Sequence, residues 1–273
     1  MHGACRTQWR GRVMMMTMTQ DLLGLACGAL VGFSLGLVGG GGSVLAVPLM
    51  VYVVGVPSAH VAIGTSAVAV AVNAAVNLSA HARSGNVRWS CALVFAAAGV
   101  AGAFIGSTFG KMLDGHKLLA LFAVLMLVIG ALMLRTRSRV GAPGVHLSWS
   151  NFPAVCGLGL MTGMLSGFFG IGGGFLIVPA LMLATGMSIL NAVSSSLVAV
   201  TAFGATTAAS YAYSGLVAWP LAGIFVAGGI LGGLVGVHAA RHLGARRGML
   251  NVVFAAIIIC VGIYMLARSL ALS

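Results

Sequence analysis

The residues of this chain that could do chemistry are mostly glycines and small polar side chains. Gly39, Gly40, Gly41 and Gly42 precede Ser43, and Gly170, Gly172, Gly173 and Gly174 form a second glycine-rich stretch. Because each glycine destabilises a helix by about 1 kcal/mol, we expect a helix to end near Val38 and a shorter one to begin near Ser43. A helix N-terminus offers free N–H groups and a partial positive charge, which suits an anion. The alternative is that these glycines only allow close helix packing.

Short polar clusters follow both glycine-rich stretches. Hydroxyl and amide groups can donate hydrogen bonds to an oxyanion at a lower desolvation cost than charged groups. Serine and threonine in membrane helices also bond back to their own backbone, which is the structural alternative for each of them alone. We predict substrate contacts from the glycines and Ser43 together with Thr65, Ser66, Ser195 and Ser196, and further candidates are His60, Asn73, Asn77, His81 and Asn191.

Groups for other chemistries are scarce. The chain has two acidic residues, Asp21 and Asp114, and no glutamate, so an intramembrane carboxylate of the kind that ion-driven carriers usually keep is missing. The five cysteines are far apart and no pair has metal-ligand spacing. No cluster at catalytic spacing is evident. We therefore expect no enzyme activity, no cofactor and no metal.

Composition indicates that lipid surrounds the elements that position these residues. Apolar residues make up 60% of the 273 residues, charged residues make up 6%, and residues 140–240 contain no Lys, Arg, Asp or Glu. A helix needs about 20 apolar residues to cross a bilayer, so the sequence predicts an all-α, polytopic transmembrane protein. An outer-membrane barrel would show alternating segments of roughly 10 residues, and the sequence does not. The net charge of +12 is spread over short connectors, which indicates helix anchoring at the lipid surface rather than nucleic-acid binding.

The chain is predicted to be a tandem duplication. The glycine-proline pattern from Gly36 to Pro48 recurs from Gly167 to Pro179, and a Ser-Gly-x-Val-x-Trp pattern occurs at Ser84 and again at Ser214. Each repeat would contain about four full spans and one short broken or re-entrant helix. The predicted organisation is a tail at 1–20, a first membrane repeat at 21–134, a basic linker at 135–150 and a second repeat at 151–273.

The relative orientation of the repeats depends on the short segments at 43–54 and 174–186. If these segments do not cross the membrane, each half has four crossings and the copies are parallel. If they cross, each half has five crossings and the copies are inverted. Counting basic residues does not separate the two topologies. Alternating access by two similar halves favours inversion. Helix breaks at matched positions in two halves are also the best sequence indication of a transporter's binding site.

These motifs resemble the TauE/SafE sulfite exporter family, also called the 4-toluene sulfonate uptake permeases, over about residues 21–270. The similarity rests on the two glycine-rich elements before Val-Pro, each followed by an Ala-x-Gly-Thr-Ser type element. That element reads Ala62–Ser66 in the first copy, whereas Ala192–Ser196 has serines in place of Gly-Thr. The resemblance implies a bacterial inner-membrane, multi-pass carrier of sulfite, sulfoacetate or another organosulfonate.

The sequence thus predicts a secondary carrier that moves a small, sulfur-containing anion by alternating access, with the substrate and the lipid bilayer as its partners. A membrane enzyme would need a catalytic cluster that the chain lacks. The other alternative is a membrane scaffold or assembly protein without transport activity. Matched helix breaks argue against a scaffold, because a passive helix bundle has little reason to keep interruptions that destabilise it.

Overall fold

The computed structural model describes residues 18–83, 85–135, 151–170, 172–242, 256 and 258–268, and the statements below concern these residues. Most of the predicted N-terminal tail and of the predicted linker lie outside the described residues. All regular structure in the described part is helical, as expected for the fold class. The elements are α2 (Met18–Val38), η1 (Gly39–Leu45), α3 (Ala46–Pro48), η2 (Leu49–Val53), α4 (Ala59–Ala82), α5 (Trp89–Met112), α6 (Gly115–Arg135), α7 (Phe152–Phe169), α8 (Gly174–Thr185), α9 (Ile189–Tyr213), α10 (Trp219–His242) and a final helix (Ile258–Arg268).

Six of these helices, α2, α4, α5, α7, α9 and α10, are long and apolar enough to cross a membrane. Their outward faces carry large apolar side chains, for example Phe104, Phe109 and Leu231, which are 61%, 53% and 61% exposed. Such a surface fits lipid and not water. The chain therefore has the architecture of a polytopic membrane protein.

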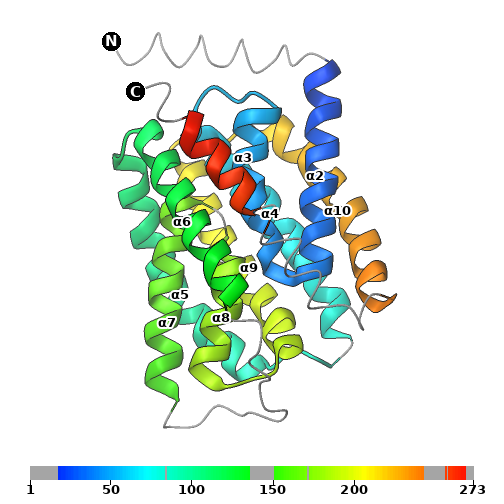
Figure 1. Ribbon diagram of the computed structural model, residues 1–273, viewed down its shortest axis with the longest axis vertical. Helices are drawn as coiled ribbons and strands as arrows, with labels where there is room; N and C mark the ends of the chain where they lie inside the picture. The colour runs from blue at the N-terminus through cyan, green and yellow to red at the C-terminus, as the bar shows by residue number, and fades with distance from the viewer. Residues whose placement is uncertain are drawn as a thin grey trace.

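The two central helices are α4 and α9, which cross each other in the interior (Figure 1). In each of these two helices, 67% of an apolar 18-residue stretch is buried inside the protein, whereas the buried share is 39–44% in the other four spans. Serine N-caps begin both helices: the Ser58 hydroxyl accepts a hydrogen bond from the Val61 N–H, and the Ser188 hydroxyl accepts one from the Asn191 N–H. A capping hydroxyl satisfies one of the N–H groups that a helix leaves unpaired at its start.

Glycine seams join the outer helices in pairs, α2 with α10 and α7 with α5. A Cβ atom on Gly32 would run into the backbone of α10 at Gly229, and one on Gly106 would run into the backbone of α7 at Met164. Small residues spaced by four let helix backbones approach this closely. Gly99, Gly102 and Gly106 of α5 all lie in such close contacts, because a Cβ atom on any of them would collide with a neighbouring helix.

Helices α2 and α7 run in opposite directions (Figure 1). Helix α2 starts at the end where α5 finishes and α6 begins, which we name the Lys111 end. Helix α7 starts at the other end, where α4 finishes and α5 begins, which we name the Arg88 end. The pairs α2–α10 and α7–α5 are the contacts that two inverted copies would make. The duplication itself stays a prediction.

Candidate anion-binding site

The second glycine-rich stretch forms a sharp interruption between α7 and α8. Helix α7 ends at Phe169, where the left-handed Gly170 donates its N–H to the Ser166 carbonyl. Gly172 and Gly173 are also left-handed, with φ angles of +69° and +64°. A residue with a Cβ adopts this conformation at a cost of about 1–2 kcal/mol. The glycines are therefore required for the turn, and α8 starts directly after them at Gly174.

The first peptide groups of α8 offer hydrogen-bond donors at this interruption. The Leu176 and Ile177 N–H groups donate to the Gly173 carbonyl, at 2.9 and 3.1 Å. Gly174 and Phe175, the first two residues of α8, are both buried. The N–H groups at the start of a helix have no carbonyl one turn earlier within that helix. An anion oxygen at this point would lie at the positive end of the α8 dipole.

The Ser166 hydroxyl faces the same turn from α7. Its side chain is fully buried, and its Oγ atom finds no hydrogen-bond partner among the described residues. A Cβ atom placed on Gly173 would lie 2.9 Å from this Oγ. Ser166 was missed in the sequence interpretation, although it is the one serine of α7 and lies a single turn before the first glycine of the interruption. It places an unpaired hydroxyl donor beside the start of α8.

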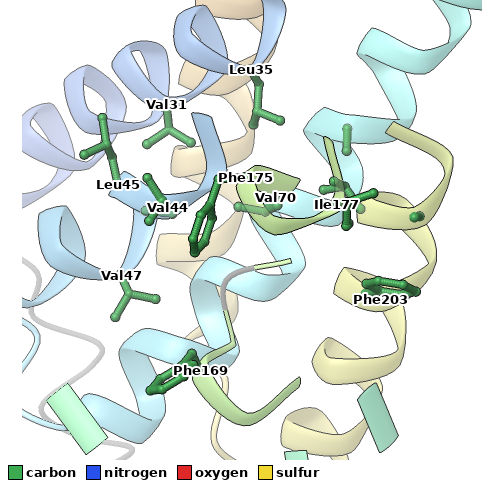
Figure 2. Close-up of a cluster of buried hydrophobic side chains, with 14 of the residues drawn as sticks. Val31, Leu35, Val44, Leu45, Val47, Val70, Phe169, Phe175, Ile177 and Phe203 are labelled. Atoms are coloured by element: carbon green, nitrogen blue, oxygen red, sulfur yellow. The ribbon is translucent and has the colours of Figure 1, made fainter. Parts of the chain in front are cut away.

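The interruption lies against the crossing of α4 and α9. A Cβ atom on Gly172 would lie 2.9 Å from Val70 Cγ1 on α4 and 3.3 Å from Val200 Cγ1 on α9. Figure 2 shows Phe169, Phe175 and Ile177 in one apolar cluster with Val44, Val47 and Val70. Apolar side chains exclude water, and hydrogen bonds to an ion are stronger in such surroundings than in water. The donors are thus set in a dry, closely packed interior.

The first glycine tract takes a different conformation. Helix α2 ends at Val38 as expected, but Gly39–Leu45 continue as a 3-10 helix instead of breaking the chain before a new helix at Ser43. In a 3-10 helix the N–H groups bond to carbonyls three residues back, so few of them are left for a ligand. A Cβ atom on Gly42 would run into the α2 backbone at Leu35. For Gly42, close packing explains the glycine.

The two glycine-rich elements nevertheless meet inside the protein. The 3-10 helix η1, which includes the fully buried Ser43, packs against both α8 and α9. Figure 2 shows Val44 and Leu45 of this segment beside Phe175 of α8. The chain after η1 returns to the Lys111 end, whereas α8 returns to the Arg88 end (Figure 1). The second stretch thus presents donors, and the first supplies part of the wall around them.

The hydroxyls of Thr65 and Ser195, both predicted substrate contacts, accept hydrogen bonds from loops between helices. Thr65 Oγ1 accepts a hydrogen bond from the Ala218 N–H at 3.0 Å, and Ser195 Oγ accepts one from the Arg88 N–H at 2.9 Å. Both donors belong to the Ser-Gly-x-Val-x-Trp segments, which form the turns before α5 and α10. The structure therefore gives these two hydroxyls corresponding structural bonds on either side of the α4–α9 crossing. Their role as substrate ligands stays a prediction.

The remaining predicted residues do not gather around one point. The hydroxyls of Ser66 and Ser196 donate to carbonyls of their own helices, at 3.0 and 2.8 Å, as the structural alternative expects. The Ser194 hydroxyl lies 3.3 Å from His81 Nδ1 near the Arg88 end. Asn191 lies in the first turn of α9, and His60 lines a cavity at the Lys111 end.

Among the predicted polar residues, Asn73 is buried with both polar atoms of its side chain lacking hydrogen bonds in the described part of the chain. It is 1% exposed, and both its Oδ1 and Nδ2 atoms lack a hydrogen-bond partner among the described residues. Its amide lies against Gly229 of α10, where a Cβ atom would collide with it. Asn77, one turn further along α4, donates from Nδ2 to the Asn73 carbonyl at 2.9 Å. An unsatisfied amide in this interior costs about 1–3 kcal/mol unless something bonds to it.

Metal chemistry finds no support in the part of the chain that the structure describes. No three His, Cys, Asp or Glu side chains come together there in a way that could hold a metal ion. The described cysteines Cys27, Cys91, Cys156 and Cys260 are free thiols. The donors at this site are therefore peptide amides and neutral side chains.

Comparison with known proteins identifies relatives along nearly the whole chain. A "probable membrane transporter protein" of Xylella fastidiosa is 50% identical over 257 residues, which cover 94% of this chain and 98% of the relative. A protein of the same description from Haemophilus influenzae is 33% identical over 64% of this chain and 67% of its own. The "probable membrane transporter protein YunE" of Bacillus subtilis is 28% identical over 81% and 88% of the two chains.

No solved structure matches the chain. The family model described as "Sulfite exporter TauE/SafE" matches residues 24–265, which include both glycine-rich elements and both central helices. The chain belongs to the TauE/SafE sulfite exporter family.

Proposed function

We propose that this protein is a secondary carrier of the cell inner membrane that moves a small anion, such as sulfite, sulfoacetate or another organosulfonate, by alternating access. The observation that carries the proposal is the α7–α8 interruption, where the buried Ser166 hydroxyl lacks a partner among the described residues and lies beside the buried start of α8. Donors of this kind suit the oxygens of a sulfite or sulfonate group.

Family membership and the names of the relatives support the class of function. The relatives from Xylella fastidiosa and Haemophilus influenzae are both described as probable membrane transporters. The scarcity of acidic residues also supports an anion as cargo, because the described spans carry no buried carboxylate that would repel it. The same features argue against a membrane enzyme.

The path of the chain supports alternating access. The η1–η2 segment returns to the Lys111 end and α8 returns to the Arg88 end, so each glycine-rich element connects the interior with a different side. In this structure apolar side chains, including Phe175 and Val44, fill the space between the elements (Figure 2). We assign this packing to an occluded conformation without substrate, from which either element can open.

The test is a flux assay in proteoliposomes with radiolabelled sulfite, thiosulfate and organosulfonates, with and without a pH gradient. Ser166→Ala removes a donor that lacks a protein partner, so transport should fall about tenfold or more, the usual effect of losing a hydrogen bond to a charged group. Thr162→Val is the matched control. It lies one turn earlier on α7, and its hydroxyl already donates to the Leu158 carbonyl at 2.7 Å.

The control variant should transport at close to the wild-type rate. Absence of flux for every anion tested, by folded protein, would leave the scaffold alternative as the better account. If Ser166→Ala and Thr162→Val reduced transport equally, the Ser166 hydroxyl would have no specific role, and the α7–α8 interruption would not be the substrate site.

A further inference from the structure

A cavity of about 400 Å³ lies at the Lys111 end of the protein, apart from the α7–α8 interruption. It is lined by η2 and the loop after it, by the first turns of α4 and α6, and by the end of the final helix. Cavities of 300–1,000 Å³ are typical of small-molecule sites. Along α4, the cavity at Ala59 is about 16 Å from Val70, where the interruption lies.

A positioned arginine stands on one side of this cavity. The Arg268 guanidinium donates to the Tyr264 hydroxyl at 2.8 Å, and its Cζ atom lies 5.4 Å from the centre of the Tyr52 ring. The two tyrosine rings pack edge to face at 5.5 Å. The bond to Tyr264 uses one of the five N–H donors of a guanidinium. The Arg268 guanidinium is thus held in place at the cavity wall, and its remaining N–H groups can donate to a ligand.

Two histidines and two helix starts also line the cavity. His60 lies in the first turn of α4 and His116 in the first turn of α6. The His60 Nε2 atom is buried and has no hydrogen-bond partner among the described residues. A Cβ atom on Gly115 would lie 3.6 Å from His60 Nδ1, so the imidazole is confined between the two helix starts.

The charges around the cavity are unbalanced. Asp114, whose Oδ1 accepts the His116 N–H at 3.1 Å, does not line the cavity. Among the described lining residues, Arg268 is the one with a permanent charge, so the cavity favours a negatively charged ligand.

We propose that this cavity is a second oxyanion-binding site at the membrane surface, for a sulfate- or phosphate-type group. Arg268 binds the charge, His60 Nε2 and His116 contribute polar contacts, and Val56, Leu119 and the Tyr52 ring accommodate an attached apolar group. Such a group can come from a dissolved anion or from the headgroup of an anionic lipid. The inference is independent of the carrier proposal, since it concerns binding at equilibrium.

The experiment follows the histidine side chains by NMR in protein labelled with 15N-histidine, with the His60 and His116 signals assigned from His60→Gln and His116→Gln variants. In nanodiscs of phosphatidylcholine, sulfate should shift both signals in a saturable way. Arg268→Gln should weaken this binding about tenfold or more, because a charge-assisted contact is lost. Arg268→Lys keeps the charge without the planar fork and should give an intermediate affinity.

The matched control is Arg83→Gln, an exposed arginine at the C-terminal end of α4, whereas the cavity lies at the start of this helix. It should bind sulfate as the wild type does. In nanodiscs with phosphatidylglycerol, shifted signals before sulfate is added and competition with sulfate would identify the lipid headgroup as the ligand. Unchanged signals would identify the dissolved anion. Absence of a saturable shift in both lipids, or equal weakening by Arg268→Gln and Arg83→Gln, would overturn the proposal.

Discussion

The two glycine-rich elements have similar composition and different conformations. Gly39–Gly42 wind into a 3-10 helix that continues α2, whereas Gly170, Gly172 and Gly173 are left-handed and break the chain between α7 and α8. The first element continues as a helix, and the second places the start of α8 beside the Ser166 hydroxyl, which has no partner among the described residues. Glycine content therefore predicts where a helix ends, but the packing around it decides which element can bind a ligand.

The central helices show a second difference at positions 73 and 203, which are as far apart in the chain as Ser84 and Ser214 of the repeated pattern. Asn73 of α4 lies against Gly229 of α10, and Phe203 of α9 lies against Gly99 of α5. The Phe203 ring stacks on Phe95 at 6.2 Å, so this side is filled by aromatic carbon. On the α4 side, by contrast, the Asn73 amide is polar and has no hydrogen-bond partner among the described residues. The interior is thus asymmetric at this pair of positions, with an amide on one side and an aromatic ring on the other.

The largest expected effect distinguishes the two glycine-rich elements. Gly172→Ala should reduce anion flux in proteoliposomes about tenfold or more, because alanine at φ +69° is strained by about 1–2 kcal/mol and its methyl group would approach Val70 Cγ1 to 2.9 Å. Gly40→Ala lies in a right-handed 3-10 helix, which alanine adopts readily. It should retain most of the transport.

Both variants need the same amount of inserted, monodisperse protein, measured before reconstitution. If Gly40→Ala abolishes transport as completely as Gly172→Ala, the first element takes part in the site despite its helical backbone. If both variants transport normally, the glycine-rich elements serve only close packing.

Asn73→Leu tests the second comparison, with an intermediate effect. Leucine has the same branched shape and number of heavy atoms as asparagine and removes two unsatisfied polar atoms, so the melting temperature of the purified protein should rise, by the equivalent of about 1–3 kcal/mol. Transport should fall, because the interior loses a polar group that the substrate can use. A variant with lower stability would show that the amide has a partner in the folded protein.

The sequence allowed the helices and the end of α2 at Val38 to be predicted, because these features follow from local composition and spacing. The left-handed turn and the role of Ser166 could not be predicted, since they depend on how α7, α8 and the central helices meet. The same holds for Thr65 and Ser195. Their donors are 153 and 107 residues away in the chain, on loops whose position only the tertiary structure fixes.

The smallest effects are expected at these two hydroxyls, where the two halves should behave alike. Thr65→Val and Ser195→Ala each leave a loop N–H without its acceptor, at Ala218 and Arg88 respectively. Each should lower stability by about 1–3 kcal/mol, seen as a lower melting temperature in detergent, while Thr65→Ser retains the bond and the stability. Transport corrected for folded protein should change little in all three variants. A loss of substrate affinity in Thr65→Val at unchanged melting temperature would instead place this hydroxyl on the substrate, and would make the two halves unequal at this position as well.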